Sequence, residues 1–317
     1  MKRASLTVVS AMAAAAVLAG CGGSSGDAET DAAAEPAGSQ EFDQELFDLL
    51  PDGIQESKTI SFGALWETPP IISVDPKDTK TPIGITPDLA DAVSEVLGVT
   101  PEWQNMQWPA QLPGLQAGNV DVLWGQVSDS KEREESVADI IAWAQSPLAL
   151  LVASGNPEDI GALGDACGLK VAVPIGSQQS AAVEGVSGTA CEGKDPIEAV
   201  EYPGAQQAIV ALKAGSVDAW FDSASAIREA ADAGGFDVVP LEQDEIGAYM
   251  QTISGVAIAK EQPGLTQAIH GALVQLAESG EYQEILEKWE VPDNALPVEE
   301  IKINGFTGIE AGEKAQA

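Results

Sequence analysis

The chain has 317 residues, with 50 acidic and 15 basic side chains, one His and a formal net charge of −35. DNA and RNA are excluded as partners, because phosphate binding requires clustered Lys and Arg. We attribute the acidity to a solvated surface, so it indicates nothing specific about a ligand.

The first twenty residues have the pattern of a secretory signal peptide. Residues 2–3 are basic, residues 6–18 form an apolar run, and Leu18-Ala19-Gly20-Cys21 closes the segment. The run is too short to span a bilayer, which takes about 20 residues. The closing sequence resembles the bacterial lipobox, in which the Cys is lipidated and becomes the new amino terminus. An ordinary signal peptide with a coincidental Cys is the alternative.

Residues 21–42 would begin with the lipidated Cys21 and continue as a Gly-, Ala-, Ser- and acid-rich segment with almost no large apolar side chain. Such a composition buries too little apolar surface to offset the entropy of ordering, so it predicts a flexible tether. A diacylated Cys21 carries two chains, which suffice for stable anchoring. We therefore expect the protein on the outer face of the cell membrane.

From about residue 57 the chain alternates short apolar strands with helices, which is typical of βαβ units and largely parallel sheets. Thr86-Pro87-Asp88 combines an N-cap, a Pro at the first helical position and an acid in the first turn, and Gly98 ends the helix that follows,. In this first part we predict strands at 59–64, 101–106 and 120–124, and helices at 86–97 and 109–118.

The same rhythm continues in the middle of the chain. Here we predict strands at 169–173, 197–201, 217–221 and 237–240, and helices at 177–184, 205–214 and 223–233. A segment at 254–259 and a long helical segment at 264–289 then close the body.

This order predicts two αβ lobes. Lobe 1 comprises residues 57–145 and 250–305, lobe 2 comprises residues 146–249, and residues 306–317 form a tail. The connectors are expected near residues 144–148 and 244–251. Because small ligands of α/β sheets bind beyond the carboxyl ends of the strands, the site is expected in the cleft between the lobes.

Cys167 and Cys191 are the two cysteines of the body. An even pair outside the cell favours a disulfide, which would close a loop of about 25 residues. A metal site, the alternative, needs further His or Cys ligands, and His270 is the one His. His270 lies in a segment with helical apolar spacing and no nucleophile-elbow motif accompanies it, so we assign it to a helix face.

Six stretches occur in an order and spacing that resemble one known family. They are GITPDLA at 84–90, WPAQLPGLQAGNVD at 108–121, SKER at 130–133, GLKVAVPIGS at 168–177, AGSVDA at 214–219 and GEYQEILEKW at 280–289. Together they are similar, over residues 57–305, to family 3 of the bacterial extracellular solute-binding proteins, the polar amino-acid receptors of ABC importers. The Cys pair around the fourth stretch is similar to a pattern in actinobacterial members.

The resemblance implies a type II periplasmic-binding-protein-like fold, with two lobes joined by two hinge strands and closing on the ligand. It implies capture of an amino acid or a similar small zwitterion and its delivery to an ABC permease in the membrane. No cofactor, metal or catalytic residue is expected, and the protein is expected to act as a monomer. An enzyme of the dehydratase type on the same fold is the alternative, for which Glu67 is the acid–base candidate.

The resemblance also implies residue roles. Arg133 matches the family Arg that holds the ligand carboxylate, and a guanidinium fork suits this role because it makes two parallel charge-assisted hydrogen bonds. A surface position within the charged run 131–135 is the alternative. The other matched positions are Ser128 near the carboxylate, Gly125 and Gln126 near the ligand ammonium, and Ser177 and Gln178 at a helix start whose N–H groups attract an anion.

The remaining candidates lie where the chain departs from the family pattern. Asp222 precedes the usual position of the acid that binds the ammonium by one residue, so Asp222 and Ser223 are alternatives for this role. Trp66 would cover the ligand side chain or stack on a cation. Glu67 would pair with a second positive group and favour a basic ligand. Both are equally compatible with an exposed loop, and Trp108 is added as a cleft residue.

Overall fold

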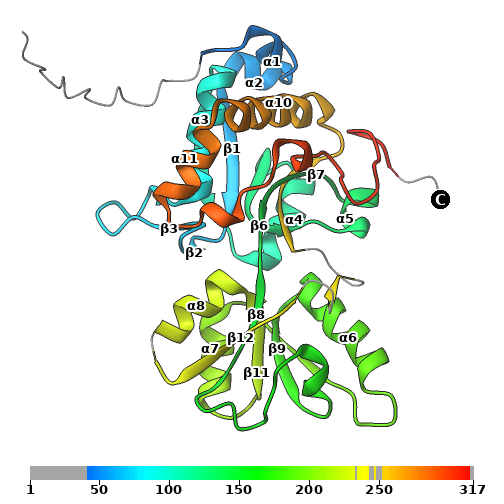
Figure 1. The fold of residues 1–317 in the computed structure, drawn as a ribbon. Helices are drawn as coiled ribbons and strands as arrows, with labels where there is room; N and C mark the ends of the chain where they lie inside the picture. Colours follow the sequence, from blue (N-terminus) through cyan, green and yellow to red (C-terminus); the bar gives the residue numbers. More distant parts are fainter. Residues whose placement is uncertain (1–40, 233, 243–245, 248–251, 315–317) are drawn as a thin grey trace, which may run out of the picture. The chain divides into compact units, whose positions relative to one another are not determined.

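The computed structural model describes residues 41–232, 234–242, 246–247 and 252–314 (Figure 1). The predicted signal peptide at 1–20, Cys21, nearly all of the tether and most of the second connector lie outside the described residues. In the part that is described, no helix is both long and apolar enough to cross a membrane.

Two five-stranded sheets carry the fold. The first has the order β5-β1-β6-β13-β7 and the second has the order β10-β9-β11-β8-β12. In each sheet the first three strands are parallel and the last two pairings are antiparallel. The predicted α/β class is therefore confirmed. The strands are β1 (Thr59–Ala64), β5 (Thr100–Asn105), β6 (Val122–Ser128), β7 (Ala138–Gln145), β8 (Leu148–Ala153), β9 (Lys170–Pro174), β10 (Glu198–Tyr202), β11 (Ala219–Ser223), β12 (Phe236–Pro240) and β13 (Ile253–Ala259).

The chain passes between the sheets twice, and a described residue of the first passage contacts the end of the second. Ser146 and Pro147 alone separate β7 of the first sheet from β8 of the second. The return runs from β12 to β13, and the N–H of Ser146 donates to the carbonyl O of Thr252 at 2.7 Å. Strands β8 and β13 are the first strands along the chain after the two passages, and each pairs antiparallel with the parallel part of the sheet that it enters.

Helices cover both faces of each sheet, because successive strand residues point to opposite sides. In the second sheet, Leu150 packs in a cluster with α6 residues such as Val183, whereas its neighbour Leu151 packs with α7 and α8 residues such as Ile227. The helices are α3 (Ile85–Leu97), α4 (Trp108–Gln116), α5 (Lys131–Ser136), α6 (Gln178–Ala190), α7 (Ala205–Lys213), α8 (Ala224–Asp232), α10 (Pro263–Ser279) and α11 (Glu281–Lys288), with short 3-10 turns η1 (Leu163–Ala166), η2 (Pro292–Asn294) and η3 (Val298–Glu300).

The predicted long helical segment at 264–289 is wrong in one respect, since it forms two helices. Gly280 separates α10 from α11 and has φ +93°, a left-handed conformation that ends a helix and that glycine adopts without steric cost,. Strands β7 and β8 were not predicted, because their nearly continuous apolar residues lack an alternating pattern,. A small third sheet, made of β2 (Glu67–Thr68), β3 (Ile72–Val74) and β4 (Pro82–Ile83), was also not predicted.

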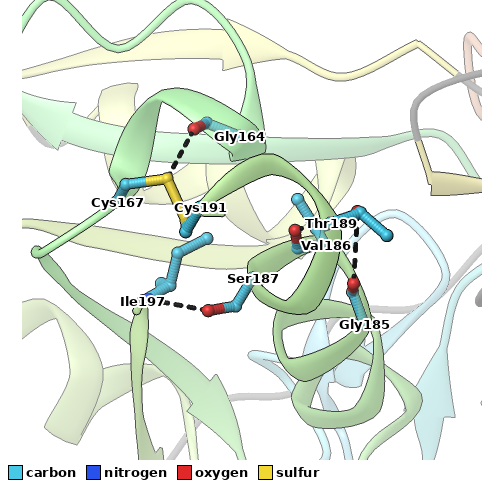
Figure 2. Close-up of a disulfide and its surroundings, with 8 residues drawn as sticks. All are labelled: Gly164, Cys167, Gly185, Val186, Ser187, Thr189, Cys191 and Ile197. Carbon is cyan, nitrogen blue, oxygen red and sulfur yellow. Dashed lines mark hydrogen bonds between the residues drawn. A yellow bond between two sulfur atoms is a disulfide. The ribbon is translucent and has the colours of Figure 1, made fainter. Parts of the chain in front are cut away.

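Cys167 and Cys191 form a disulfide with a Cα–Cα distance of 5.5 Å, which confirms the predicted pair (Figure 2). The bond joins the end of η1 to the end of α6. Nearby, the N–H of Ile197 donates to Oγ of Ser187 at 2.9 Å, so α6 is also attached to the segment that leads into β10 (Figure 2).

Two short helices precede the first strand, α1 (Gln44–Asp48) and α2 (Asp52–Ser57). Helix α1 packs on the helices α3 and α10, whereas α2 packs against β1. The side chain of Gln275 donates to Asp43 at 2.6 Å, and the N–H of Asp43 donates to the carbonyl O of Val96 at 2.8 Å. Gly271 admits Leu46, since a Cβ there would lie 2.6 Å from the leucine side chain. The ordered body thus begins before residue 57.

The described part of the predicted tail, residues 306–314, is attached to the first sheet through two buried carboxylates. Glu134 accepts from the N–H of Phe306 at 2.9 Å and from that of Thr307 at 2.6 Å. Asp139 accepts from the N–H of Gly312 at 2.8 Å and forms a buried ion pair with Lys260 at 2.9 Å.

Replacing Lys260 with Ala should lower the free energy of unfolding by about 3–5 kcal/mol, because it leaves the Asp139 carboxylate buried without its cation. Urea denaturation measures the change. The control is Lys314→Ala, which breaks an exposed ion pair with Glu261 at 3.0 Å and should change stability little,. Equal effects of the two substitutions would contradict this prediction.

Candidate functional site

A cavity of about 90 Å³ lies between the two sheets and receives residues from both. The first-sheet side supplies Leu65, Glu67, Thr68, Trp108, Gln111, Gln126 and Ser128, and the second-sheet side supplies Val173, Ser177, Gln179, Tyr202, Trp220, Asp222, Ser223 and Ala226. Ser128 and Ser223 are the last residues of β6 and β11, so the cavity lies at strand ends, where α/β sheets bind ligands,.

Arg133 lies directly behind the cavity wall. Its helix α5 begins after Ser130, whose Oγ accepts from the N–H of Arg133 at 3.4 Å. The guanidinium donates from Nη1 to the carbonyl O of Ser128 at 2.7 Å and lies 5.5 Å from the ring centre of Trp108. Both of these partners line the cavity. Desolvation lowers the pKa of Arg133 to about 10, so the group is still charged at neutral pH.

Trp108 connects this corner to the second sheet. Its Nε1 donates to the carbonyl O of Ile175 at 3.0 Å, two residues before Ser177. Ser177 is the N-cap of α6, and its Oγ accepts from the N–H of Ser180 at 3.4 Å. Since Ser177 also lines the cavity, its capping role and a role beside a ligand are compatible. The free N–H groups and the positive dipole end of α6 favour an anion at this end of the cavity.

A carboxylate lies at the end of β11. Asp222 accepts from the N–H of Ser223 at 2.7 Å, and both residues line the cavity, so the two sequence alternatives lie together. Desolvation raises the pKa of Asp222 to about 6, although the Ser223 hydrogen bond opposes the shift. Within the described residues Asp222 has no salt-bridge partner, which leaves its negative charge available to a ligand cation.

Gln126 crosses from β6 to the second sheet. Its Nε2 donates at 3.0 Å to Oγ of Ser223 and at 3.0 Å to Oγ of Ser225, at the start of α8. Gln126 therefore lines the cavity and also contacts the second sheet directly.

Besides Arg133, which lies behind the wall, three of the predicted residues do not line the cavity. Trp66 is 6% exposed and packs in the core of the first sheet, while its neighbours Leu65 and Glu67 face the cavity. The structure thus places Trp66 on the opposite side of the chain from its expected position over the ligand. Gly125 is buried against Ala64, and its Cβ-less backbone permits that approach, since an added Cβ would lie 3.1 Å away. Gln178 does not line the cavity, whereas the next residue, Gln179, does.

Sequence reasoning missed Gln111, which is 2% exposed and lines the cavity. Its Nε2 donates to the carbonyl O of Met106 at 3.2 Å, while Oε1 is buried without a partner among the described residues. The spacing was a usable signal, because Gln111 follows Trp108 by three positions on α4 and so shares its face. His270, as expected, lies on a helix, and its Nε2 contacts the carbonyl O of Ile301 at 2.8 Å.

Comparison with known sequences agrees with this geometry. The profile described as bacterial extracellular solute-binding proteins, family 3, matches residues 60–292. The arginine-binding protein ArgT of Corynebacterium glutamicum is 28% identical over 268 residues, which cover 80% of this chain and 81% of that protein. The L-cystine-binding protein TcyJ of Escherichia coli K12 is 25% identical over 245 residues, which cover 76% and 85%. These relatives are binding proteins and not enzymes.

Comparison with solved structures confirms the predicted type II periplasmic-binding-protein-like fold. An ancestral arginine-binding protein bound to glutamine is 26% identical, with a TM-score of 0.63, over 73% of this chain and 97% of that one. A substrate-binding protein of a Streptococcus pneumoniae ABC uptake transporter with bound histidine is similar in fold, with a TM-score of 0.66 over 77% and 96% at 24% identity.

Asp222→Asn should stabilise the ligand-free protein at neutral pH but not in acid. The pKa of Asp222 is about 6 in the folded protein against an ordinary 3.8. The folded state therefore holds the proton more tightly, and this contribution to stability is present below pH about 4 and is lost as the pH rises through about 6. The free energy of unfolding of the variant should exceed that of the parent by on the order of 2 kcal/mol at pH 7, and the two should be equal near pH 4.

Urea unfolding at a series of pH values measures this difference. Glu184→Gln is the control, because Glu184 is an exposed carboxylate on α6 and its removal should leave the pH profile unchanged. A constant difference between Asp222→Asn and the parent from pH 4 to pH 7 would show that the Asp222 carboxyl is not desolvated.

Proposed function

The chain belongs to the bacterial extracellular solute-binding proteins, family 3, and we propose that it captures an amino acid outside the cell and delivers it to an ABC permease. The observation that carries the proposal is the cavity between the sheets, which has a buried Arg and a helix start at one end and a separate carboxylate. Relatives named as arginine- and cystine-binding proteins support an amino acid as the ligand.

The ligand carboxylate is assigned to the end where Arg133, Ser128 and the start of α6 meet. Arg133 supplies a charge-assisted fork from the first sheet, and the N–H groups after Ser177 supply donors from the second. The hydrogen bond from Trp108 to Ile175, which brings α4 to the loop before α6, supports this assignment. A carboxylate held there makes contacts to both sheets at once.

The ligand ammonium is assigned to Asp222, with Ser223 and Gln126 beside it. A desolvated carboxylate gains most from a cation, because the ion pair offsets the cost of burial. Gln111 offers its amide oxygen as an acceptor for another ligand N–H. Each of these groups lines the cavity, which supports a zwitterion as the ligand class.

We further propose that the two sheets are the centres of two lobes, residues 57–145 with 250–305 and residues 146–249, which close on the ligand. Closure has a physical cause, since a ligand that contacts both lobes stabilises the closed form over the open one. The short passage at Ser146 and Pro147 and its hydrogen bond to Thr252 support a hinge at this place.

Arg133→Ala should abolish binding of the ligand. In a thermal-shift screen of amino acids, a ligand at 100 times its dissociation constant should stabilise the parent by about 2.7 kcal/mol, which raises the Tm by several degrees. The variant should show no shift with the same ligand. Lys131→Ala is the control, because Lys131 is an exposed cation on the same helix, with 65% of its side chain accessible.

Two outcomes would count against the proposal. A ligand that shifts Arg133→Ala as much as the parent would remove the carboxylate assignment. Absence of a shift with every amino acid would contradict amino-acid capture itself.

Lipid anchoring at Cys21 is part of the proposal and rests on the sequence of residues 1–21 alone. Cys21→Ser should release the protein from the membrane fraction into the medium, because the acyl chains supply the anchor. Cell fractionation and metabolic labelling with an alkyne fatty acid measure this. An unlabelled parent protein found free in the medium would contradict the anchor and leave the binding assignments unaffected.

A further inference from the structure

The loop that carries Glu67 borders two cavities. Glu67 itself lines the binding cavity, and Pro69 and Pro70, which follow it closely, line a second cavity of about 280 Å³. Ser146, at the passage between the sheets, lines both cavities. Glu67 therefore lies where the binding cavity approaches the second one.

Glu229 approaches the same boundary from the second sheet. It lies on α8 three positions after Ala226, which lines the binding cavity, and four positions after Ser225, which accepts the hydrogen bond from Gln126. Residues three and four apart share a helix face, so Glu229 faces the first sheet. It lines the second cavity together with Pro69 and Pro70.

The negative charge of Glu67 acts on the carboxyl of Glu229. The pKa of Glu229 is raised first by desolvation and then by the negative charge of Glu67. Two negative charges that approach from opposite sides repel each other unless a cation lies between them. Within the described residues, neither Glu67 nor Glu229 has a salt-bridge partner.

The charges around the cavity are unbalanced even when a zwitterion is bound. Glu67 and Asp222 are the charged residues among those described in the cavity wall, and Arg133 lies behind it. On the proposed function, the ligand carboxylate balances Arg133 and the ammonium balances Asp222. Glu67 then has no partner. The second cavity adds Arg228, but it also adds Glu229 and Asp232, so the excess stays negative.

We propose that Glu67 and Glu229 form a specificity-determining pair that selects an amino acid with a cationic side chain. This inference rests on the proposed function and names the ligand class of the same site. The side chain extends from the binding cavity toward the second cavity, and its positive charge lies between a carboxylate of each sheet. A neutral side chain of the same length leaves both carboxylates uncompensated and binds more weakly.

The test compares ligands that match in size and differ in charge. Isothermal titration of the protein, purified in the form that the cell exports, would use L-arginine and its neutral counterpart L-citrulline, with L-lysine and L-glutamine as a second pair. We expect the cationic member of at least one pair to bind about tenfold or more tightly than the neutral member. This comparison needs no variant, so it does not depend on whether a variant folds.

The variants then test the residues. Glu67→Gln combined with Glu229→Gln should reduce the preference to less than about threefold, mainly by weakening the cationic ligand. Both side chains are exposed, and Gln keeps their size and hydrogen-bonding capacity. Glu184→Gln on the exposed side of α6 removes the same unit of charge away from both cavities and should retain the full preference.

The outcomes separate this inference from the proposed function. Equal binding of the cationic and neutral members of both pairs would overturn the inference and leave amino-acid capture in place. A preference that survives the double substitution would overturn the role of Glu67 and Glu229. Absence of binding by any amino acid would overturn the proposed function and the inference with it.

Discussion

The two passages between the sheets, joined by the hydrogen bond from Ser146 to Thr252, are the constraint on which the site depends. Each passage is followed by a strand that inserts antiparallel beside the parallel strands of the sheet it enters. The ends of β6 and β11 consequently converge on one cavity, and every side chain of the site is positioned by one of these two sheets. A ligand in the cavity therefore contacts both halves without any further element.

The electrostatics of the cavity follow from where the sheets place their charges. The guanidinium of Arg133 is buried behind Ser128, where Trp108 shields it, while Asp222 and Glu67 face the cavity itself. The chain as a whole has a net charge of −35, so a buried cation at one end of the cavity makes the local electrostatic potential positive where the surroundings are negative. On the proposed assignment, the placement of this one Arg orients a zwitterion more than the overall charge does.

Much of the fold was predictable, because its signals are local. The helix at Ile85–Leu97 has Pro near its start and Gly98 at its end, and the βαβ alternation indicates the class directly. The cavity wall was predictable where a motif places a residue at the end of a strand, as for Ser128, or at a helix start, as for Ser177. The cavity wall was not predictable where membership depends on the direction in which a side chain points. Trp66 and Gln178 are each one position away from a residue that does line the cavity. A shift of one position places a side chain on the opposite face of an extended segment, or turns it by about 100° around a helix. Short α1 and the apolar strands β7 and β8 carry too little periodicity to be recognised.

The segment after residue 292 lies outside the region that matches the family, yet it contacts residues next to the candidate site. The match ends at residue 292, yet Phe306 and Thr307 donate to Glu134, the immediate neighbour of Arg133 on α5, and Gly312 donates to Asp139 on β7. The helix that positions the buried cation is therefore held in part by residues beyond the matched region. On the proposed function, variation or trimming of this carboxyl-terminal segment changes the ligand site through a single short helix. The segment is then a place where affinity can evolve without any change in the cavity wall.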